Sequence, residues 1–276
     1  MPSQHFAVNA AWFKLALLAW VERRASSTNA KARRPKKEEP LSGEGAFHLL
    51  LRDRYLVLIA VMILLLNWVN SAGEFIFDRT ILAAVGDAQS RGISAEAFVG
   101  GIKADYFAWY NLLGLLLQLF AVSRILAKFG VRNSLLILPV FAVLAYTSAA
   151  AIPVLAVLRL VKIGENTLEY SIAETSRHAL FLVTSRAEKY VGKTSVDTIA
   201  VRAGAVMSAC VVWVGARVGL SLAGFAAINA ALSVIWIGVV FAIGREHARR
   251  SREDAKTIAA EPSPPRRPAR DPAMAR

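Results

Sequence analysis

The chain has 276 residues, of which 55% are hydrophobic and 19% are charged, and this composition excludes an ordinary soluble domain with a well-solvated surface. A formal net charge of +13 would suggest nucleic-acid binding in a soluble protein. Here the charges lie between and beyond apolar runs, so we expect contacts with membrane lipids and no nucleic acid as a partner. The sequence therefore predicts an all-α, polytopic membrane protein.

The first 46 residues are expected to contain no complete membrane crossing. Residues 1–21 include an apolar run, Phe6 to Val21, which is shorter than the roughly 20 residues that a crossing helix needs and is interrupted by Lys14. This run fits an interfacial helix or the end of a truncated span. Residues 22–46 are basic and contain Ser and Pro, which predicts a flexible cytoplasmic loop.

Residues 47–247 are predicted to form a bundle of six transmembrane helices. The six apolar runs are Tyr55 to Phe77, Tyr106 to Ser123, Ser134 to Ile152, Val154 to Val183, Val196 to Ala216 and Leu220 to Ile243. We expect Arg79 to Lys103 to be a linker, and Tyr106, Trp109 and Tyr110 to lie in an aromatic belt at the membrane surface. Residues 248–276 are basic and rich in Pro, which predicts a disordered tail.

The distribution of Lys and Arg predicts the orientation of these helices. Twenty-four of these residues lie before the first run, after the sixth, or in the loops that would share that side, and only four lie in the alternate loops. The positive-inside rule therefore places both termini in the cytoplasm. We expect an integral membrane protein, of a bacterial inner membrane.

The run from Val154 to Val183 carries ionisable residues that a membrane helix rarely has. On a helical wheel one face contains Arg159, Lys162, Asn166, Glu169 and Arg177, and the opposite face is mostly aliphatic. Such a stripe usually faces a water-filled cavity or partner helices and marks a substrate or ion pathway. Charges near the ends, such as Arg159 and Arg177, are equally well explained by snorkelling to the membrane surface.

The first crossing repeats this one-sided polarity. Asn67, Asn70 and Glu74 share one face with Asp78, while Leu and Ile occupy the rest. The two Asn residues could instead join helices by hydrogen bonds, and the two carboxylates could lie at the water boundary.

We expect no enzyme activity, cofactor or metal site. A nucleophile elbow and the motifs H-E-x-x-H, C-x-x-C and G-x-G-x-x-G are all absent from the sequence. The single cysteine, Cys210, lies in an apolar run and is expected to be a small packing residue.

Three stretches resemble a known family of membrane proteins. They are ENTLEYSIAETSRHALFLVTSRAEKYVGKTSVDTIAVRAG, LNWVNSAGEF and YFAWYNLLGLLLQLFAVSRILAKFGVR, and they resemble the C-terminal half of the ATP/ADP antiporter (nucleotide transporter) family of plastids and intracellular bacteria. The resemblance extends from about Phe47 to His247. It implies a major-facilitator-like fold of two six-helix bundles that exchanges nucleotides without hydrolysing them. It also implies a general role in the pathway or its gate for residues of the matching region: Lys162, Glu169, Arg177, Asp197 and Arg202.

One departure from that family is large, because a complete member has twelve crossings and only six are predicted here. Alternating access places the binding site between two bundles. We therefore expect a missing N-terminal bundle or a second copy of the chain as partner.

Two hypotheses follow. The first is a secondary transporter, or its C-terminal half, for ATP/ADP or another small organic anion. Its cations would bind the anion, and Glu74 and Glu169 would be gate partners or proton carriers. The second is a structural membrane subunit, or an inactive fragment, whose buried ion pairs fix helix register.

Overall fold

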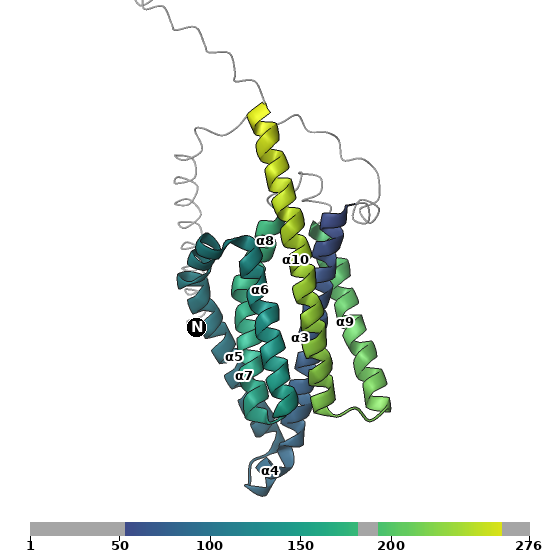
Figure 1. Cartoon of the computed structure of the whole chain (residues 1–276). Helices are drawn as coiled ribbons and strands as arrows, with labels where there is room; N and C mark the ends of the chain where they lie inside the picture. The colour runs from purple at the N-terminus through teal and green to yellow at the C-terminus, as the bar shows by residue number, and fades with distance from the viewer. Residues whose placement is uncertain (1–52, 182–192, 261–276) are drawn as a thin grey trace, which may run out of the picture. The chain divides into compact units, whose positions relative to one another are not determined.

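The computed structural model describes residues 53–181 and 193–260, with side chains described for residues 53–181 and 198–252. These residues all belong to one compact unit of the chain, Glu44–Arg276. Every regular element among them is a helix, and this described part contains no strand (Figure 1). The predicted all-α class is therefore confirmed. The segments 1–21 and 22–46 lie outside the described residues.

The helices keep the order of the chain. They are α3 (Arg54–Ala83), α4 (Val85–Ser90), α5 (Ala95–Phe120), α6 (Val122–Ala151), α7 (Leu155–Leu168), the π-helical turn η2 (Glu169–Ala173), α8 (Glu174–Leu180), α9 (Lys193–Arg217) and α10 (Leu222–Ala260).

Four segments are long and apolar enough to cross a membrane: Arg54–Ser90, Val122–Ala151, Thr198–Arg217 and Leu222–Arg252. They overlap the first, third, fifth and sixth predicted crossings, which supports an integral membrane protein. The second and fourth predicted crossings correspond to α5 and to α7–η2–α8, which carry more polar and charged residues.

The predicted linker from Arg79 to Lys103 is mostly helical, so that prediction is wrong. Helix α3 continues to Ala83, α4 follows at once, and α5 begins at Ala95. The start of α5 is favoured by Ser94, whose Oγ accepts a hydrogen bond from the backbone N–H of Ala97 at 3.2 Å.

Helix α6 contains one break and one proline. Gly130 has φ 73° and ψ 170°, a conformation outside the helical region that glycine adopts without steric cost. The basic residues Arg124, Lys128 and Arg132, which lie before Ser134, are therefore helical on both sides of this break. Pro139 lies inside the longer part of α6 without ending the helix.

The C-terminal tail also differs from the prediction. Helix α10 continues to Ala260, whereas disorder was expected from residue 248. Side chains one turn apart support the extension, since Arg249 Nη2 donates a hydrogen bond to Glu246. Residues 261–276 lie outside the described part.

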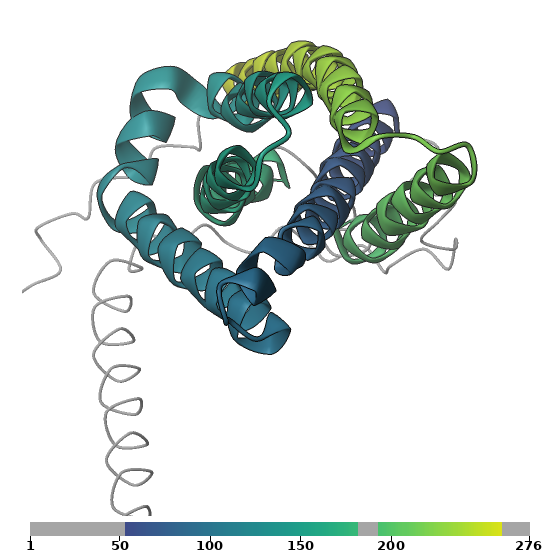
Figure 2. The ribbon, with the colours of Figure 1, turned by 90° about the horizontal axis from the view of Figure 1, so that it is seen from below.

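Helix α7 is enclosed by its neighbours, and this arrangement positions the candidate site. Seen along the bundle, α7 lies between α3, α5 and α6, while α10 packs on α3 and α6 and α9 packs on α3 (Figure 2). The approach of α9 to α3 is close, because a Cβ atom added to Gly204 would lie 2.5 Å from the carbonyl oxygen of Leu64.

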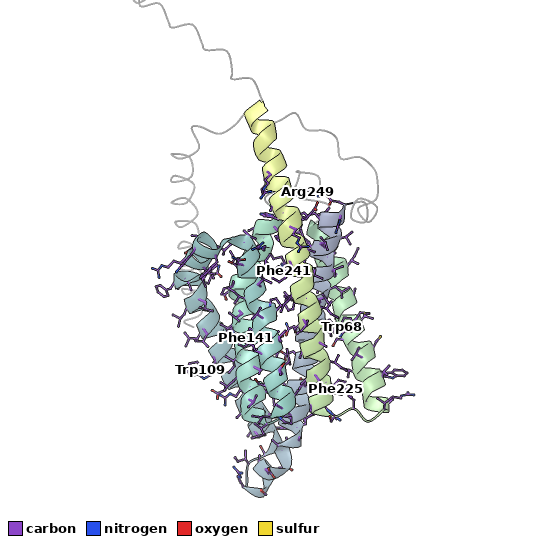
Figure 3. The ribbon with its side chains drawn as sticks, in the orientation of Figure 1. Trp68, Trp109, Phe141, Phe225, Phe241 and Arg249 are labelled. Atoms are coloured by element: carbon purple, nitrogen blue, oxygen red, sulfur yellow. The ribbon has the colours of Figure 1, made fainter. Side chains whose placement is uncertain are left out.

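Aromatic and cysteine side chains do not all lie where they were predicted. Trp109 lies on the outer side of α5 and is 48% exposed, as in an aromatic belt (Figure 3). Tyr106, expected beside it, is instead buried. Cys210, expected to be packed, is exposed on α9.

Candidate functional site

The centre of the candidate site is Lys162, whose side chain is fully buried. Its Nζ lies 2.7 Å from Oε2 of Glu165, one turn later on α7, and 3.3 Å from Oε1 of Glu74 on α3. It also donates a hydrogen bond to Oδ1 of Asn70 at 2.7 Å. A buried ammonium group needs such partners, because burying an unpaired charge is very costly. The N–H groups of the Lys162 ammonium therefore have acceptors on two helices, α3 and α7.

A glycine on α3 gives the ammonium group its room. A Cβ atom added to Gly73 would lie 3.2 Å from Nζ of Lys162 and only 1.9 Å from Oη of Tyr146 on α6. The hydroxyl of Tyr146, which is itself fully buried, donates a 2.7 Å hydrogen bond to Oε2 of Glu165. Helices α3, α6 and α7 thus meet at one point around the same carboxylate and ammonium pair.

Helix α5 supplies the partners on the other side of Glu74. The hydroxyl of Tyr106 donates to Oε1 of Glu74 at 2.8 Å and accepts a hydrogen bond from the side-chain amide of Asn166. Nζ of Lys103 lies 3.7 Å from Oε2 of Glu74 and also pairs with Asp78. The same ammonium lies 5.1 Å from the centroid of the Phe77 ring, which adds a cation–π contact.

Glu169 lies at the start of η2 and is connected to Lys162 through Asn70. The amide nitrogen of Asn70 donates a 2.8 Å hydrogen bond to Oε2 of Glu169, while its amide oxygen accepts the bond from Lys162. Isolated π-helical turns are frequent at functional sites. The residues joined in this way are called the Lys162 cluster below: Asn70, Glu74, Asp78, Lys103, Tyr106, Tyr146, Lys162, Glu165, Asn166 and Glu169.

Five of the residues predicted for the site are brought together in this cluster: Asn70, Glu74, Lys162, Asn166 and Glu169. The polar face of the first predicted crossing, in α3, therefore lies against the polar face of the charged run, in α7 and η2.

Four predicted residues have other surroundings. Asn67 donates to the carbonyl of Ile63 in its own helix, at 2.8 Å. Arg177 pairs with Glu174 on α8, at 2.7 Å. Arg202 is exposed on α9, and none of the ion pairs among the described residues includes it. The side chain of Asp197 lies outside the described part of the chain.

Five members of the cluster were not predicted for the site, and one of them, Asp78, had been placed only on the polar face of the first crossing. Glu165 could have been found, because it follows Lys162 by three residues and such a pair shares a helix face. Lys103 was assigned to the linker and Tyr106 to an aromatic belt. Tyr146 lies in a nearly uncharged run, and no sequence signal connects it with α7.

A second polar cluster joins the beginning of α3 to α10. The hydroxyl of Tyr55 donates to the carbonyl of Leu180 at 2.9 Å and lies 3.0 Å from Nδ1 of His247. Arg250 donates to the carboxylate of Asp53, and its guanidinium lies 4.7 Å from the centroid of the Tyr55 ring. Burial acts to raise the pKa of Asp53, but the hydrogen bond and positive charge of Arg250 and the backbone N–H groups of Tyr55 and Leu56 together lower it by more, so the pKa lies below its ordinary value.

In the described part of the chain, no three His, Cys, Asp or Glu side chains are grouped so that they could hold a metal ion. The chemistry that the Lys162 cluster offers is ion pairing and hydrogen bonding.

Comparison of the chain with protein-family models, with curated proteins and with solved structures gave no match, so the Lys162 cluster is interpreted from its geometry and its charges.

Proposed function

We propose that the protein is a secondary transporter, or the C-terminal half of one, and that the Lys162 cluster is part of its substrate pathway or gate. The proposal rests on one observation: a fully buried ammonium group is held between carboxylates of two helices in a bundle of membrane-crossing length. Ionisable groups inside a membrane are costly, and they usually mark a route for ions or substrates. In this proposal α5 and α7–η2–α8 complete a set of six crossings.

The proposed substrate is a small organic anion, and a nucleotide such as ATP or ADP is the first candidate because of the family that the sequence resembles. The pairing of Lys162 with Glu74 fits a substrate-free gate, since a phosphate or carboxylate oxygen could replace the Glu74 carboxylate as partner. In alternating access the second wall of the site comes from another bundle. A partner bundle or a second copy of this chain would provide it.

The experiment is uptake into proteoliposomes by whichever assembly is competent: the chain alone, its dimer, or the chain with a partner bundle. We expect Lys162→Ala to abolish uptake of labelled nucleotide while membrane insertion is unchanged. Lys128→Ala, which removes the same charge from an exposed position on α6, is the matched control and should transport normally. Unchanged uptake by Lys162→Ala contradicts the proposal.

A variant that takes up no nucleotide could be unfolded, or it could be folded but unable to transport, and these two cases have to be distinguished. Removing one partner of a buried ion pair costs about 3–5 kcal/mol, because the other charge stays buried and unpaired. The double variant Lys162→Ala/Glu165→Gln also removes the buried carboxylate that lies 2.7 Å from the Lys162 ammonium, which reduces this cost. A double variant that is folded and still inactive supports a role of Lys162 in transport.

One observation favours a second candidate function, a structural membrane subunit. Lys162 is fully buried, and its ammonium group is already surrounded by protein acceptors, as expected of an ion pair that fixes the register of two helices. Thermal unfolding with and without substrate separates the two functions. A transporter gains about 2.7 kcal/mol from a ligand present at 100 times its Kd, whereas a structural subunit gains nothing.

A further inference from the structure

The Lys162 cluster contains more negative than positive groups. Its four carboxylates are Glu74, Asp78, Glu165 and Glu169, and its two ammonium groups are Lys103 and Lys162. With all of them ionised, two negative charges remain without a positive partner. Burying an uncompensated charge is unfavourable, so the buried part of the cluster favours the uptake of positive charge.

A second observation also indicates that the cluster lacks positive charge: it contains a buried hydrogen-bond acceptor that has no donor. Asn166 is only 5% exposed, and its amide nitrogen donates to Tyr106 within the cluster. Its amide oxygen Oδ1 is buried and has no hydrogen-bond partner. Buried acceptors normally have a donor, so the cluster lacks donors as well as positive charge.

Glu169 is the carboxylate with the weakest compensation. Its one hydrogen bond comes from the neutral amide of Asn70, at 2.8 Å. Among the described residues, no Lys or Arg nitrogen lies within 4.0 Å of its carboxylate oxygens. The ammonium group that shares Asn70 with Glu169, that of Lys162, is already engaged by Glu165, Glu74 and Asn70.

We propose that Glu169 reversibly binds a proton, and that this proton is coupled to the Lys162–Glu74 gate through Asn70. The reaction forms an O–H bond on the Glu169 carboxylate from a proton of the aqueous phase and breaks no other bond. A proton on Glu169 reduces the negative charge that an anionic substrate would meet at the cluster. This coupling to a substrate, unlike the proton site itself, rests on the proposed transport function.

The surroundings of Glu169 suit a proton better than a metal ion. No metal-holding group of His, Cys, Asp or Glu is found in the described part of the chain, whereas a proton needs a single carboxylate. The titratable and charged groups on the elements packed around Glu169 include Glu74 and Asp78 of α3, Lys103, Tyr106 and Tyr110 of α5, Tyr146 of α6, Lys162 and Glu165 of α7, Tyr170 of η2, and Glu174, Arg177 and His178 of α8. Within the Lys162 cluster carboxylates outnumber ammonium groups, so protonation of one carboxylate relieves repulsion among the others.

The asparagine between the two groups explains how they communicate. Asn70 binds the ammonium of Lys162 through its oxygen and the carboxylate of Glu169 through its nitrogen. A hydrogen bond to an ionised acceptor is roughly twice as strong as one to a neutral acceptor. Protonation of Glu169 therefore weakens its hold on Asn70, and with it the constraint that Asn70 places on Lys162.

The test is an infrared titration of the purified full chain in lipid nanodiscs. A protonated carboxyl group has a C=O stretching band that a carboxylate lacks, and we expect such a band near neutral pH. Glu169→Gln should remove it while keeping the fold, because the amide oxygen can still accept from Asn70. Glu96→Gln, an exposed position in the first turn of α5, is the matched control and should leave the band unchanged.

Two outcomes overturn the proton site: no titrating band in the wild-type chain, or a band that survives Glu169→Gln. Failure of the transport proposal would look different, because the spectrum needs no substrate. A chain that takes up no nucleotide, but loses its band in Glu169→Gln, has the proton site without the proposed transport. In a competent assembly we further expect nucleotide binding to change the band in the wild-type chain and in Glu96→Gln.

Discussion

Substitution of Gly73 by alanine tests whether α3, α6 and α7 meet as closely as described. The added methyl carbon would lie 1.9 Å from Oη of Tyr146, 3.0 Å from Cζ of the same ring and 3.2 Å from Nζ of Lys162. Tyr146 is fully buried and its hydroxyl is bonded to Glu165, so the ring has no free space into which it could move. The added methyl group therefore strains the packing of the helices and also displaces the Tyr146 hydroxyl from its hydrogen bond.

The expected cost has two parts. Overpacking of a well-packed interior costs about 1–3 kcal/mol. Loss of the hydrogen bond from Tyr146 to the charged Glu165 costs about 1.5–3 kcal/mol. Alanine returns up to about 1 kcal/mol through its higher helix propensity. We therefore expect Gly73→Ala to lower the free energy of unfolding by about 1.5–6 kcal/mol.

The assay is unfolding of the chain in mixed micelles by a denaturing detergent, followed by tryptophan fluorescence. Gly238→Ala is the matched control, because a Cβ atom there has nothing within 4 Å, and it should be neutral or slightly stabilising. Tyr146→Phe removes the atom that the methyl group would meet, so adding Gly73→Ala to it should cost much less than Gly73→Ala alone. The reasoning is refuted if Gly73→Ala and Gly238→Ala unfold alike.

Two further predictions concern the ends and the surface of the bundle. The pKa of Asp53 lies below its ordinary value of 3.8, because the charge and hydrogen bond of Arg250 and the backbone hydrogen bonds together outweigh burial. The contribution of Asp53 to stability is therefore complete above pH 3.8 and is lost as the pH falls through the lowered pKa. Acid unfolding of Asp53→Asn should accordingly be less dependent on pH below about pH 4 than that of the wild-type chain, and equal profiles would contradict the Asp53–Arg250 contact. Cys210 is the single cysteine of the chain and is exposed on α9, so a spin label there should collide more often with oxygen than with a water-soluble nickel chelate in liposomes. The opposite order would place this face of α9 in water.

Much of the fold follows from the sequence, because each uninterrupted apolar run of membrane-crossing length predicts one helix independently of the others. The predicted spans at Tyr55, Ser134, Val196 and Leu220 all overlap long apolar helices. Boundaries were less predictable. The mixed-charge segment from Arg79 to Lys103 is helical because capping and local hydrogen bonds suffice where hydrophobic periodicity is weak.

The site was predictable only where its residues share a helix. Three- and four-residue spacing placed Asn70 with Glu74, and Lys162 with Glu169, on polar stripes. Which neighbour faces each stripe depends on the rotation and crossing of packed helices, and a helical wheel contains neither. Tyr146 therefore remained unpredicted, and a helical wheel could not place Arg202, which is exposed on α9, relative to the Lys162 cluster.

The outer surface of α5 determines how the protein has to be handled. Only Tyr106 of this helix is buried, and its large apolar side chains are exposed along most of its length: Phe107, Trp109, Leu112, Leu113, Leu115, Leu116, Leu119 and Phe120. In water this surface would drive self-association, so lipid, detergent or another helical bundle has to shield it. A melting temperature measured for this chain is thus a property of the protein together with its amphiphile, and values from different detergents are not interchangeable.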